Sequence, residues 1–447
     1  SPCGKGWGKI ENCYDRNEEN IRIMDTLLEK DKIYKPTVEA VKQAAERISK
    51  VVLKTPLAES FTYSKRFQAN IMLKREDLQQ VRSYKIRGAY NKISSLPKEQ
   101  LEKGVICASA GNHAQGVAFA CNKLKVKGVI YMPETTPMQK VEQTEMFGGK
   151  WVQVVLKGDT YDDSFKSAMK QMHEEGLVFI HPFDDEKVIE GQATIALEIL
   201  EQADEPIDYI FAPLGGGGLL AGMSSMFKKL SPDTKIIGIE PEGAPSMKTS
   251  LREGKVVELD NIERFVDGAS VQKVGARNFA ICRENLDEMI TVPEGKICQT
   301  ILDLYNQDAI VVEPAGAMAI CALDFYAEEI KGKNVVCIVS GSNNDIIRMA
   351  EIKERALLYS GLKHYFVIVF PQRAGALKEF VAKVLGPNDD ITHFEYSKKH
   401  NRSNGPAVVG IELKDPKDFG PLVERMKKKS FYGEYLNDNP NLFQFLI

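Results

Sequence analysis

The chain has 447 residues, of which 43% are hydrophobic, so it is long enough to form several large cores. Its formal net charge of −3 provides no excess of positive charge for binding a nucleic acid or an anionic membrane. No window approaches the roughly 20 apolar residues of a membrane span, and the eight scattered cysteines, which include no CxxC pair, indicate a cytoplasmic protein with reduced thiols and no zinc site.

Helix-like and strand-like segments alternate from about residue 36 onward, after an N-terminal extension over residues 1–35. Helices are predicted over 37–52 (capped by Thr37), 112–124, 136–148 and 162–176, and strands over 104–110, 127–133, 150–156, 177–183, 208–214, 235–241 and 335–341. Such alternation indicates an α/β domain with parallel sheets and crossover helices, which we place at 36–350. Because ligands bind at the carboxyl ends of parallel strands, the loops after the strands are the candidates for a site.

The pattern changes near residue 351. A connecting helix at 351–361 precedes a strand–helix–strand–strand–helix–strand order, whose last strand is the apolar run 441–447. This is the ferredoxin-like order, and it predicts a separate α+β domain at 362–447. Arg373 and Gly375, in the turn after its first strand, are candidates for ligand binding or for an interface, although each also fits an ordinary surface turn.

Three of the loops after strands are rich in small residues. "ASAGNHAQG" (108–116) offers backbone N–H groups at a helix start, which suit a carboxylate, and the donors Asn112 and His113. "FAPLGGGGLLAG" (211–222) is typical of a phosphate-binding turn. "CIVSGSNND" (337–345) places Ser340 at a strand end, where it fits a ring nitrogen, a phosphate or a helix cap equally well.

The glycine-rich loop also fits a second hypothesis, in which it binds a dinucleotide. Gly216, Gly218 and Ala221 spell G-x-G-x-x-A, and Glu240 ends the following strand, where a dinucleotide fold places the acid that binds ribose. This segment alone therefore also fits an NAD-dependent oxidoreductase.

A fourth loop, "VRSYKIRGAY" (81–90), contains Lys85. A nucleophilic lysine needs a lowered pKa, and either burial or nearby cations such as Arg82 and Arg87 would lower it. Pyridoxal 5′-phosphate has a group for each loop: an aldehyde for Lys85, a phosphate for the glycines, a phenolic oxygen for Asn112 and a ring nitrogen for Ser340. A dinucleotide would not require the lysine.

These motifs resemble those of the fold-type II pyridoxal-phosphate enzymes, whose two-subdomain core is like the tryptophan synthase β-subunit, and most closely those of the threonine dehydratase (threonine deaminase) family. "SYKIRGA", "SAGNHAQG", "GGGGL" and "SGSN" occur in the family's order, and the resemblance extends from about residue 36 to the end. It implies deamination of L-threonine to 2-oxobutanoate and ammonia by β-elimination of water. No metal-binding residue is assigned, and a monovalent cation on backbone carbonyls stays an alternative.

The resemblance also implies roles for single residues. Lys85 would bond the cofactor and act as the catalytic base, Asn112 would bind the phenolic oxygen, and Ser340 would face the ring nitrogen. The phosphate would lie on the turn of Gly215, Gly216, Gly217, Gly218 and Leu219. The substrate carboxylate would lie on the loop of Ser109, Ala110, Gly111 and His113. Glu313 matches a family acid near the cofactor.

The nearest alternatives within the fold are L-serine dehydratase and serine racemase. Racemases carry a serine where this chain has Ala110 and a metal-binding aspartate where it has Ser246, and both differences favour the dehydratase. The C-terminal unit resembles the ACT-like regulatory domain of biosynthetic threonine dehydratases, through "FPQRAGALKEF". That resemblance implies feedback inhibition by isoleucine, opposed by valine, in a homo-oligomer that is a dimer or a tetramer.

Overall fold

The computed structural model describes residues 34–396 and 404–439, and the elements below belong to the unit that spans residues 36–447. The extension predicted over 1–35 lies almost wholly outside the described residues, as does the strand predicted at 441–447. No helix in the described ranges is both long enough and apolar enough to cross a membrane.

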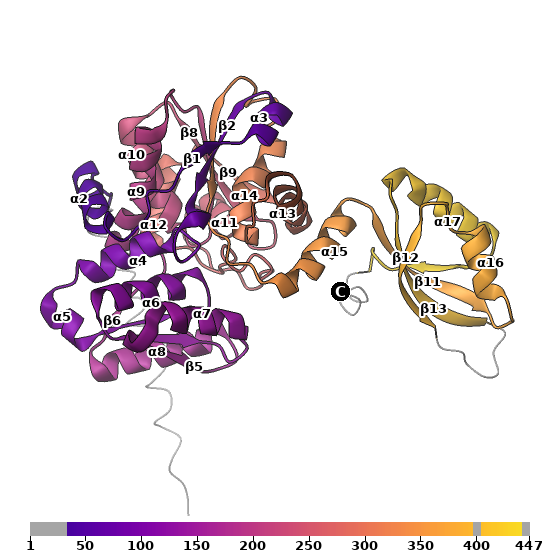
Figure 1. Cartoon of the computed structure of the whole chain (residues 1–447), viewed down its shortest axis with the longest axis horizontal. Helices are drawn as coiled ribbons and strands as arrows, with labels where there is room; N and C mark the ends of the chain where they lie inside the picture. The colour runs from indigo at the N-terminus through magenta and orange to yellow at the C-terminus, as the bar shows by residue number, and fades with distance from the viewer. Residues whose placement is uncertain (1–33, 397–403, 440–447) are drawn as a thin grey trace, which may run out of the picture. The chain divides into compact units, whose positions relative to one another are not determined.

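Two sheets form the α/β part of the chain (Figure 1). The larger sheet has the order β1 (Leu57–Glu59), β2 (Asn70–Arg75), β10 (Asn334–Val339), β7 (Tyr209–Pro213), β8 (Lys235–Pro241), β9 (Glu288–Val292). The smaller has the order β5 (Val152–Leu156), β4 (Gly128–Met132), β3 (Val105–Ala108), β6 (Val178–Phe179). Every pair is parallel except β1 with β2. Parallel sheets with crossover helices are therefore confirmed.

Helices cover both faces of the larger sheet, because its strands are apolar on both sides. One face packs against α2 (Val38–Ile48), α9 (Glu186–Gln202), α10 (Gly218–Leu230) and α12 (Ala276–Asn285). The other packs against α3 (Phe61–Phe67), α13 (Glu294–Asp308), α14 (Pro314–Cys321) and α15 (Met349–Tyr359). The predicted cap of the first helix is confirmed, since the Thr37 side chain accepts a hydrogen bond from the amide of Ala40.

The smaller sheet is likewise covered on two faces. Its core packs α4 (Lys85–Ser94), α6 (Asn112–Leu124) and α7 (Met138–Gly148) on one face and α8 (Tyr161–Glu175) on the other. Helix α8 begins with a reciprocal pair of hydrogen bonds between Thr160 and Asp163, which fixes its first turn. Two short helices, α5 (Lys98–Lys103) and α11 (Ser246–Glu253), complete the α/β part.

The C-terminal part has its own core and the ferredoxin-like arrangement that the sequence predicts. It comprises β11 (Lys363–Pro371), α16 (Ala376–Lys383), β12 (Asp390–Tyr396), β13 (Asn404–Glu412), α17 (Phe419–Lys428) and β14 (Tyr432–Tyr435). Its antiparallel sheet has the order β12-β13-β11-β14. The fourth strand of this sheet is β14, which was not predicted from the sequence; the strand predicted at 441–447 lies outside the described residues and stays a prediction. Gly375 caps α16 with a φ of +85°, and Arg373 pairs with Glu379 at 2.5 Å.

Candidate active site

A cavity of about 430 Å³ lies at the carboxyl ends of β3, β7 and β10, with walls from both sheets. It brings together nine of the residues singled out from the sequence: Lys85, Ser109, Ala110, Gly111, Asn112, His113, Gly215, Gly216 and Ser340. Glu313 also lines it. The remaining members of the glycine motif lie behind this surface, where the chain turns into α10, and the side chain of Leu219 packs in the core.

Lys85 is the first residue of α4, and its side chain points into the cavity. Its Nζ donates a hydrogen bond of 2.9 Å to the carbonyl oxygen of Pro182. Burial lowers the pKa of Lys85 to about 8, and the nearby carboxylate of Glu313 partly opposes that shift. The amine is therefore much closer to its neutral, nucleophilic form at neutral pH than a solvated lysine would be.

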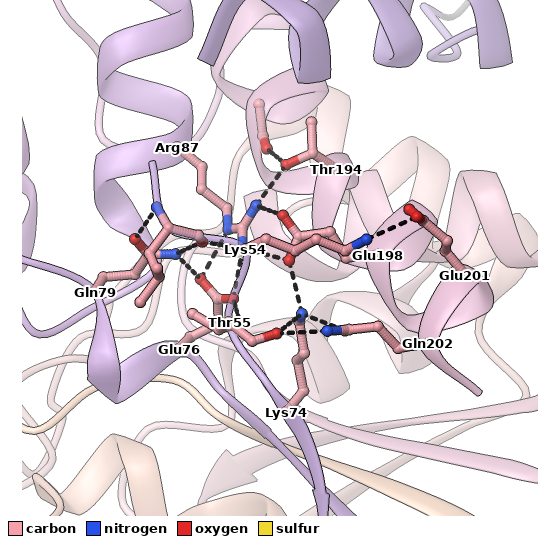
Figure 2. Close-up of polar contacts among 12 residues, drawn as sticks. Lys54, Thr55, Lys74, Glu76, Gln79, Arg87, Thr194, Glu198, Glu201 and Gln202 are labelled. Atoms are coloured by element: carbon pink, nitrogen blue, oxygen red, sulfur yellow. Dashed lines mark hydrogen bonds and ion pairs between the residues drawn. The ribbon is translucent and has the colours of Figure 1, made fainter. Parts of the chain in front are cut away.

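Arg82 and Arg87 do not produce this shift, contrary to one of our two explanations for it. Arg82 is exposed, and the guanidinium of Arg87 is fully buried among other partners. Figure 2 shows Arg87 between the carboxylates of Glu76, at 2.8 Å, and Glu198, at 2.6 Å, with Lys74 completing the cluster at 2.7 Å from Glu198. Two buried cations thus face two carboxylates in a cluster that joins α4, through Arg87, to α9, through Glu198.

Asn112 begins α6 and joins three parts of the site. Its Nδ2 donates to Glu313 Oε1 at 2.6 Å, and its Oδ1 accepts from Asn343 Nδ2 at 2.6 Å. Burial raises the pKa of Glu313 to about 7, with a further contribution from Asp267. The hydrogen bonds to Glu313 and from Asn343 hold the side-chain amide of Asn112 in one orientation at the edge of the cavity.

The glycine turn is shaped by contacts that leave no room for side chains. A Cβ at Gly216 would lie 2.2 Å from the ring of Phe183, and one at Gly215 would lie 3.0 Å from the backbone of Ala269. Gly217 has a φ of +93°, which strains any residue with a side chain. The turn therefore presents bare backbone beside the cavity, at the start of α10, where an anion is favoured.

Ser340 follows β10 and is buried, and its carbonyl oxygen accepts a hydrogen bond of 3.2 Å from the amide of Tyr84. This contact ties the serine to the residue before Lys85. His113 is also buried, and its Nε2 lies 2.8 Å from the carbonyl oxygen of Ile180. Burial lowers the pKa of His113 to about 3, so the imidazole is neutral and supplies no positive charge to a carboxylate.

Several residues that line the cavity were not predicted from the sequence. Most belong to the irregular segment 258–273, which contributes Glu258, Ile262, Arg264 and the run 267–273. Others are Lys140, Tyr161, Asp162, Pro182, Phe183 and Asn343. The segment has no strand or helix periodicity that would have revealed it. Asn343 had a visible signal, since it lies within "SGSN", the motif that pointed to Ser340.

Glu240, on which the NAD alternative depends, does not line the cavity. Its two carboxylate oxygens accept hydrogen bonds from the amides of Met247 at 2.6 Å and Lys248 at 2.9 Å, at the start of α11. The carboxylate is buried and caps a helix, so it is not placed to bind a ribose. Among the described residues, no group of three or more His, Cys, Asp or Glu side chains lies close enough together to hold a metal ion.

Comparison with known proteins assigns the chain to a family. A model for pyridoxal-phosphate dependent enzymes matches residues 48–341, and a model for the C-terminal regulatory domain of threonine dehydratase matches residues 354–446. The chain is 57% identical over 410 residues to the biosynthetic L-threonine dehydratase IlvA of Halalkalibacterium halodurans, covering 92% of this chain and 99% of that protein. The corresponding protein of Bacillus subtilis is 55% identical, with 92% and 97% covered.

Solved structures agree with this assignment. The processed form of threonine deaminase isoform 2 from Solanum lycopersicum superposes with a TM-score of 0.68 and 42% identity, covering 73% of this chain and 91% of that one. Maize serine racemase gives a TM-score of 0.67 at 30% identity, covering 73% and 99%. The NAD alternative is therefore wrong, and the chain belongs to the pyridoxal-phosphate dependent enzymes, in the family of biosynthetic L-threonine dehydratases.

Proposed function

We propose that this chain is a threonine ammonia-lyase, which uses pyridoxal 5′-phosphate to convert L-threonine into 2-oxobutanoate and ammonia, the first step of isoleucine biosynthesis. The observation that carries the proposal is the amine of Lys85, with its pKa lowered to about 8, in a cavity that also contains the glycine turn and the hydroxyl-bearing Ser340. It is supported by the 57% identity to a biosynthetic threonine dehydratase.

The residues of the cavity fit the cofactor. The turn of Gly215 to Leu219 offers backbone N–H groups to its phosphate, and Asn112 offers a fixed amide to its phenolic oxygen. Ser270 and Asn343 line the cavity, and their buried atoms Ser270 Oγ and Asn343 Oδ1 have no hydrogen-bond partner within the described part of the chain. Buried polar atoms without partners are unfavourable, so a bound polar molecule would complete them.

Each residue then has a role in the reaction. When bound, pyridoxal phosphate supplies an electron sink that makes the Cα–H of an amino acid acidic. Lys85 holds the cofactor and, once released, takes the proton from substrate Cα at its Nζ. The N–H groups at the start of α6, from Gly111 to His113, bind the substrate carboxylate, which the helix dipole favours. Ser340 provides a neutral partner for the ring nitrogen, which suits elimination better than transamination.

The test uses the purified protein. We expect a yellow protein that releases 2-oxobutanoate from threonine, and borohydride should fix the cofactor on Lys85, where peptide mass spectrometry locates it. Lys85→Ala should lose both the fixed cofactor and keto-acid release, while Lys92→Ala, about two helix turns further along α4, should keep both. Release of keto acid by Lys85→Ala at the wild-type rate would contradict the proposal. The same assay with L-serine decides between the two hydroxy amino acids.

We also propose that isoleucine inhibits the enzyme through the C-terminal domain, that valine opposes it, and that the protein is a cytoplasmic homo-oligomer, either a dimer or a tetramer. The match of residues 354–446 to a threonine dehydratase regulatory domain supports a role in control by a small molecule. We expect isoleucine to shift the threonine saturation curve of the full chain. A curve that isoleucine leaves unmoved would contradict inhibition, and light scattering would report the assembly state.

A further inference from the structure

An ion pair joins the two walls of the cavity. Lys140 lies on α7, which covers the smaller sheet, and Asp267 lies on the irregular segment 258–273. Both line the cavity, and the Lys140 Nζ contacts the carboxylate of Asp267. We call these two residues the latch. Their side chains are 17% and 37% exposed, so the latch lies where the cavity meets solvent.

The segment that carries Asp267 is held by two arginines: Arg348, which directly precedes α15, and Arg355, which lies on α15, the last helix before the C-terminal domain. Arg348 Nη2 donates to the carbonyl oxygen of Phe265 at 2.7 Å, and Arg348 Nη1 donates to Asp267 Oδ1 at 3.4 Å. The guanidinium of Arg355 lies 4.4 Å from the centre of the Phe265 ring and that of Arg348 lies 5.0 Å from it. Arg355 also pairs with Glu263 at 3.2 Å. Neither arginine lines the cavity.

Helix α15 also packs against α13 and against the first strand of the C-terminal domain. A Cβ at Gly295, in the first turn of α13, would lie 2.5 Å from the Cβ of Tyr359, so the two helices meet at their backbones. Glu354 accepts a hydrogen bond of 2.7 Å from the hydroxyl of Tyr365 and lies 3.5 Å from the Nζ of Lys363, both in the first strand of the C-terminal domain. Helix α15 thus contacts the pocket segment through Arg355 and strand β11 through the neighbouring Glu354.

We propose that Arg348 is a positioning residue: it holds Asp267 in the latch, and the position of α15 thereby sets the affinity of the cavity for its amino-acid substrate. Asp267 contacts two cations, Lys140 and Arg348, so a movement of Arg348 displaces the carboxylate that Lys140 needs. When the latched state is populated less, the apparent affinity falls by that fraction, while the chemical step of the latched molecules is unchanged. The inference rests on the proposed function, since its substrate is L-threonine.

Steady-state kinetics of the full-length holoenzyme test the proposal. We expect Lys140→Met, Asp267→Asn and Arg348→Met each to raise KM for threonine about two- to fivefold, the range for a partly exposed ion pair, with kcat unchanged within about twofold. Arg348→Met is the decisive variant, because Arg348 does not touch the cavity. Arg283→Met is the matched control: its guanidinium lies 5.5 Å from the ring centre of Phe279, on a helix that contributes nothing to the cavity, and its KM should equal that of the wild type.

A double variant tests whether Lys140 and Arg348 both act through the carboxylate of Asp267 or affect KM independently. If Lys140 and Arg348 act through the same carboxylate, Lys140→Met/Arg348→Met should raise KM no further than the larger single change. Effects that multiply would overturn the proposal. So would a loss of kcat at unchanged KM in Lys140→Met, since that residue would then act on the chemistry itself.

Hydrogen exchange provides a measurement that does not depend on turnover. In the substrate-free holoenzyme, the amides of Glu263 and Ser270 are bonded to the carbonyl oxygens of Gly243 at 2.9 Å and Val266 at 2.7 Å. Arg348→Met should accelerate their exchange several-fold, and Arg283→Met should not. Unchanged exchange in Arg348→Met overturns the positioning role. A wild type that releases no keto acid overturns the proposed function alone, because the exchange result stands by itself.

Discussion

Replacing Arg87 by methionine should destabilise the protein strongly, because the side chain is the centre of a buried charge cluster. Its guanidinium donates to both oxygens of Glu76 at 2.8 Å and to both oxygens of Glu198 at 2.6 and 2.8 Å. Arg87 and Glu76 are fully inaccessible to solvent, and Glu198 is only 17% exposed. The two carboxylates would be left with Lys74, which lies 2.7 Å from Glu198.

Removal of one partner from a buried ion pair typically costs about 3–5 kcal/mol, because the remaining charge is left without compensation. Burial by itself raises the pKa of Glu76, but the Arg87 guanidinium overrides it and holds the pKa below the ordinary value of 4.5. In the wild type, Glu76 therefore contributes stability above that value and loses it as the pH falls through the lower folded-state pKa. Without Arg87, we expect burial to raise the folded-state pKa of Glu76 above its ordinary value, and stability should then fall as the pH rises through the raised pKa.

Urea unfolding followed by circular dichroism measures both effects. At pH 7.5 we expect Arg87→Met to lower the free energy of unfolding by about 3–5 kcal/mol, and less at pH 5. Arg87→Met/Glu76→Gln restores charge balance around the Lys74–Glu198 pair and should recover part of the loss. Arg82→Met, an exposed position in the same motif, is the control and should change stability by less than about 0.5 kcal/mol. A loss below about 1 kcal/mol in Arg87→Met, with no change in its pH dependence, would refute the reasoning.

Three further predictions concern the cavity. Gly216→Ala should weaken cofactor binding at least tenfold in a fluorescence titration of the apoenzyme, because the new Cβ would lie 2.2 Å from the Phe183 ring; an unchanged dissociation constant would contradict the close fit of the turn. Acylation of Lys85 in the apoenzyme, located by mass spectrometry, should rise with pH to a midpoint near 8 and not 10.5, because burial disfavours the charged amine. Ala110→Ser, which adds a hydroxyl to the cavity wall, should introduce measurable racemisation of serine on chiral chromatography; an absence of racemisation would argue against this position as the difference between the two activities.

Local patterns in the sequence were sufficient to predict most of the strands of the α/β part and the loops after them that line the cavity. Strands such as β7 and β10 are continuous apolar runs that end in glycine- or serine-rich loops, and those loops meet at the cavity because parallel strands end on the same edge. The run 70–75 was missed as a strand because it contains Lys74 and Arg75, which look like surface residues. Lys74 is buried only because Glu198 and Gln202, more than 120 residues later, accept its hydrogen bonds at 2.7 and 2.9 Å.

The misplaced role of Arg87 has the same origin. Its proximity to Lys85 in the sequence suggested an influence on the amine, whereas its partners are Glu76 and Glu198, which come from a different loop and a different helix. Pairing of this kind depends on the tertiary fold and leaves no periodic signal. Ser340 and Asn112 could be found because they belong to short motifs, but the contact of Asn112 with Glu313 spans 201 residues and could not.

The two ends of the irregular segment 258–273 pair through an isolated antiparallel β-bridge between Glu258 and Lys273. The amide of Leu259 also donates a hydrogen bond of 2.9 Å to the carbonyl oxygen of Gln272. It belongs to neither sheet, yet it supplies much of one cavity wall. Because the segment pairs with no strand, substitutions at its cavity-lining positions leave strand pairing undisturbed, whereas its buried residues Phe265, Val266 and Ala269 belong to the core of the larger sheet. We therefore regard it as the natural starting point for directed evolution toward larger or more polar amino acids.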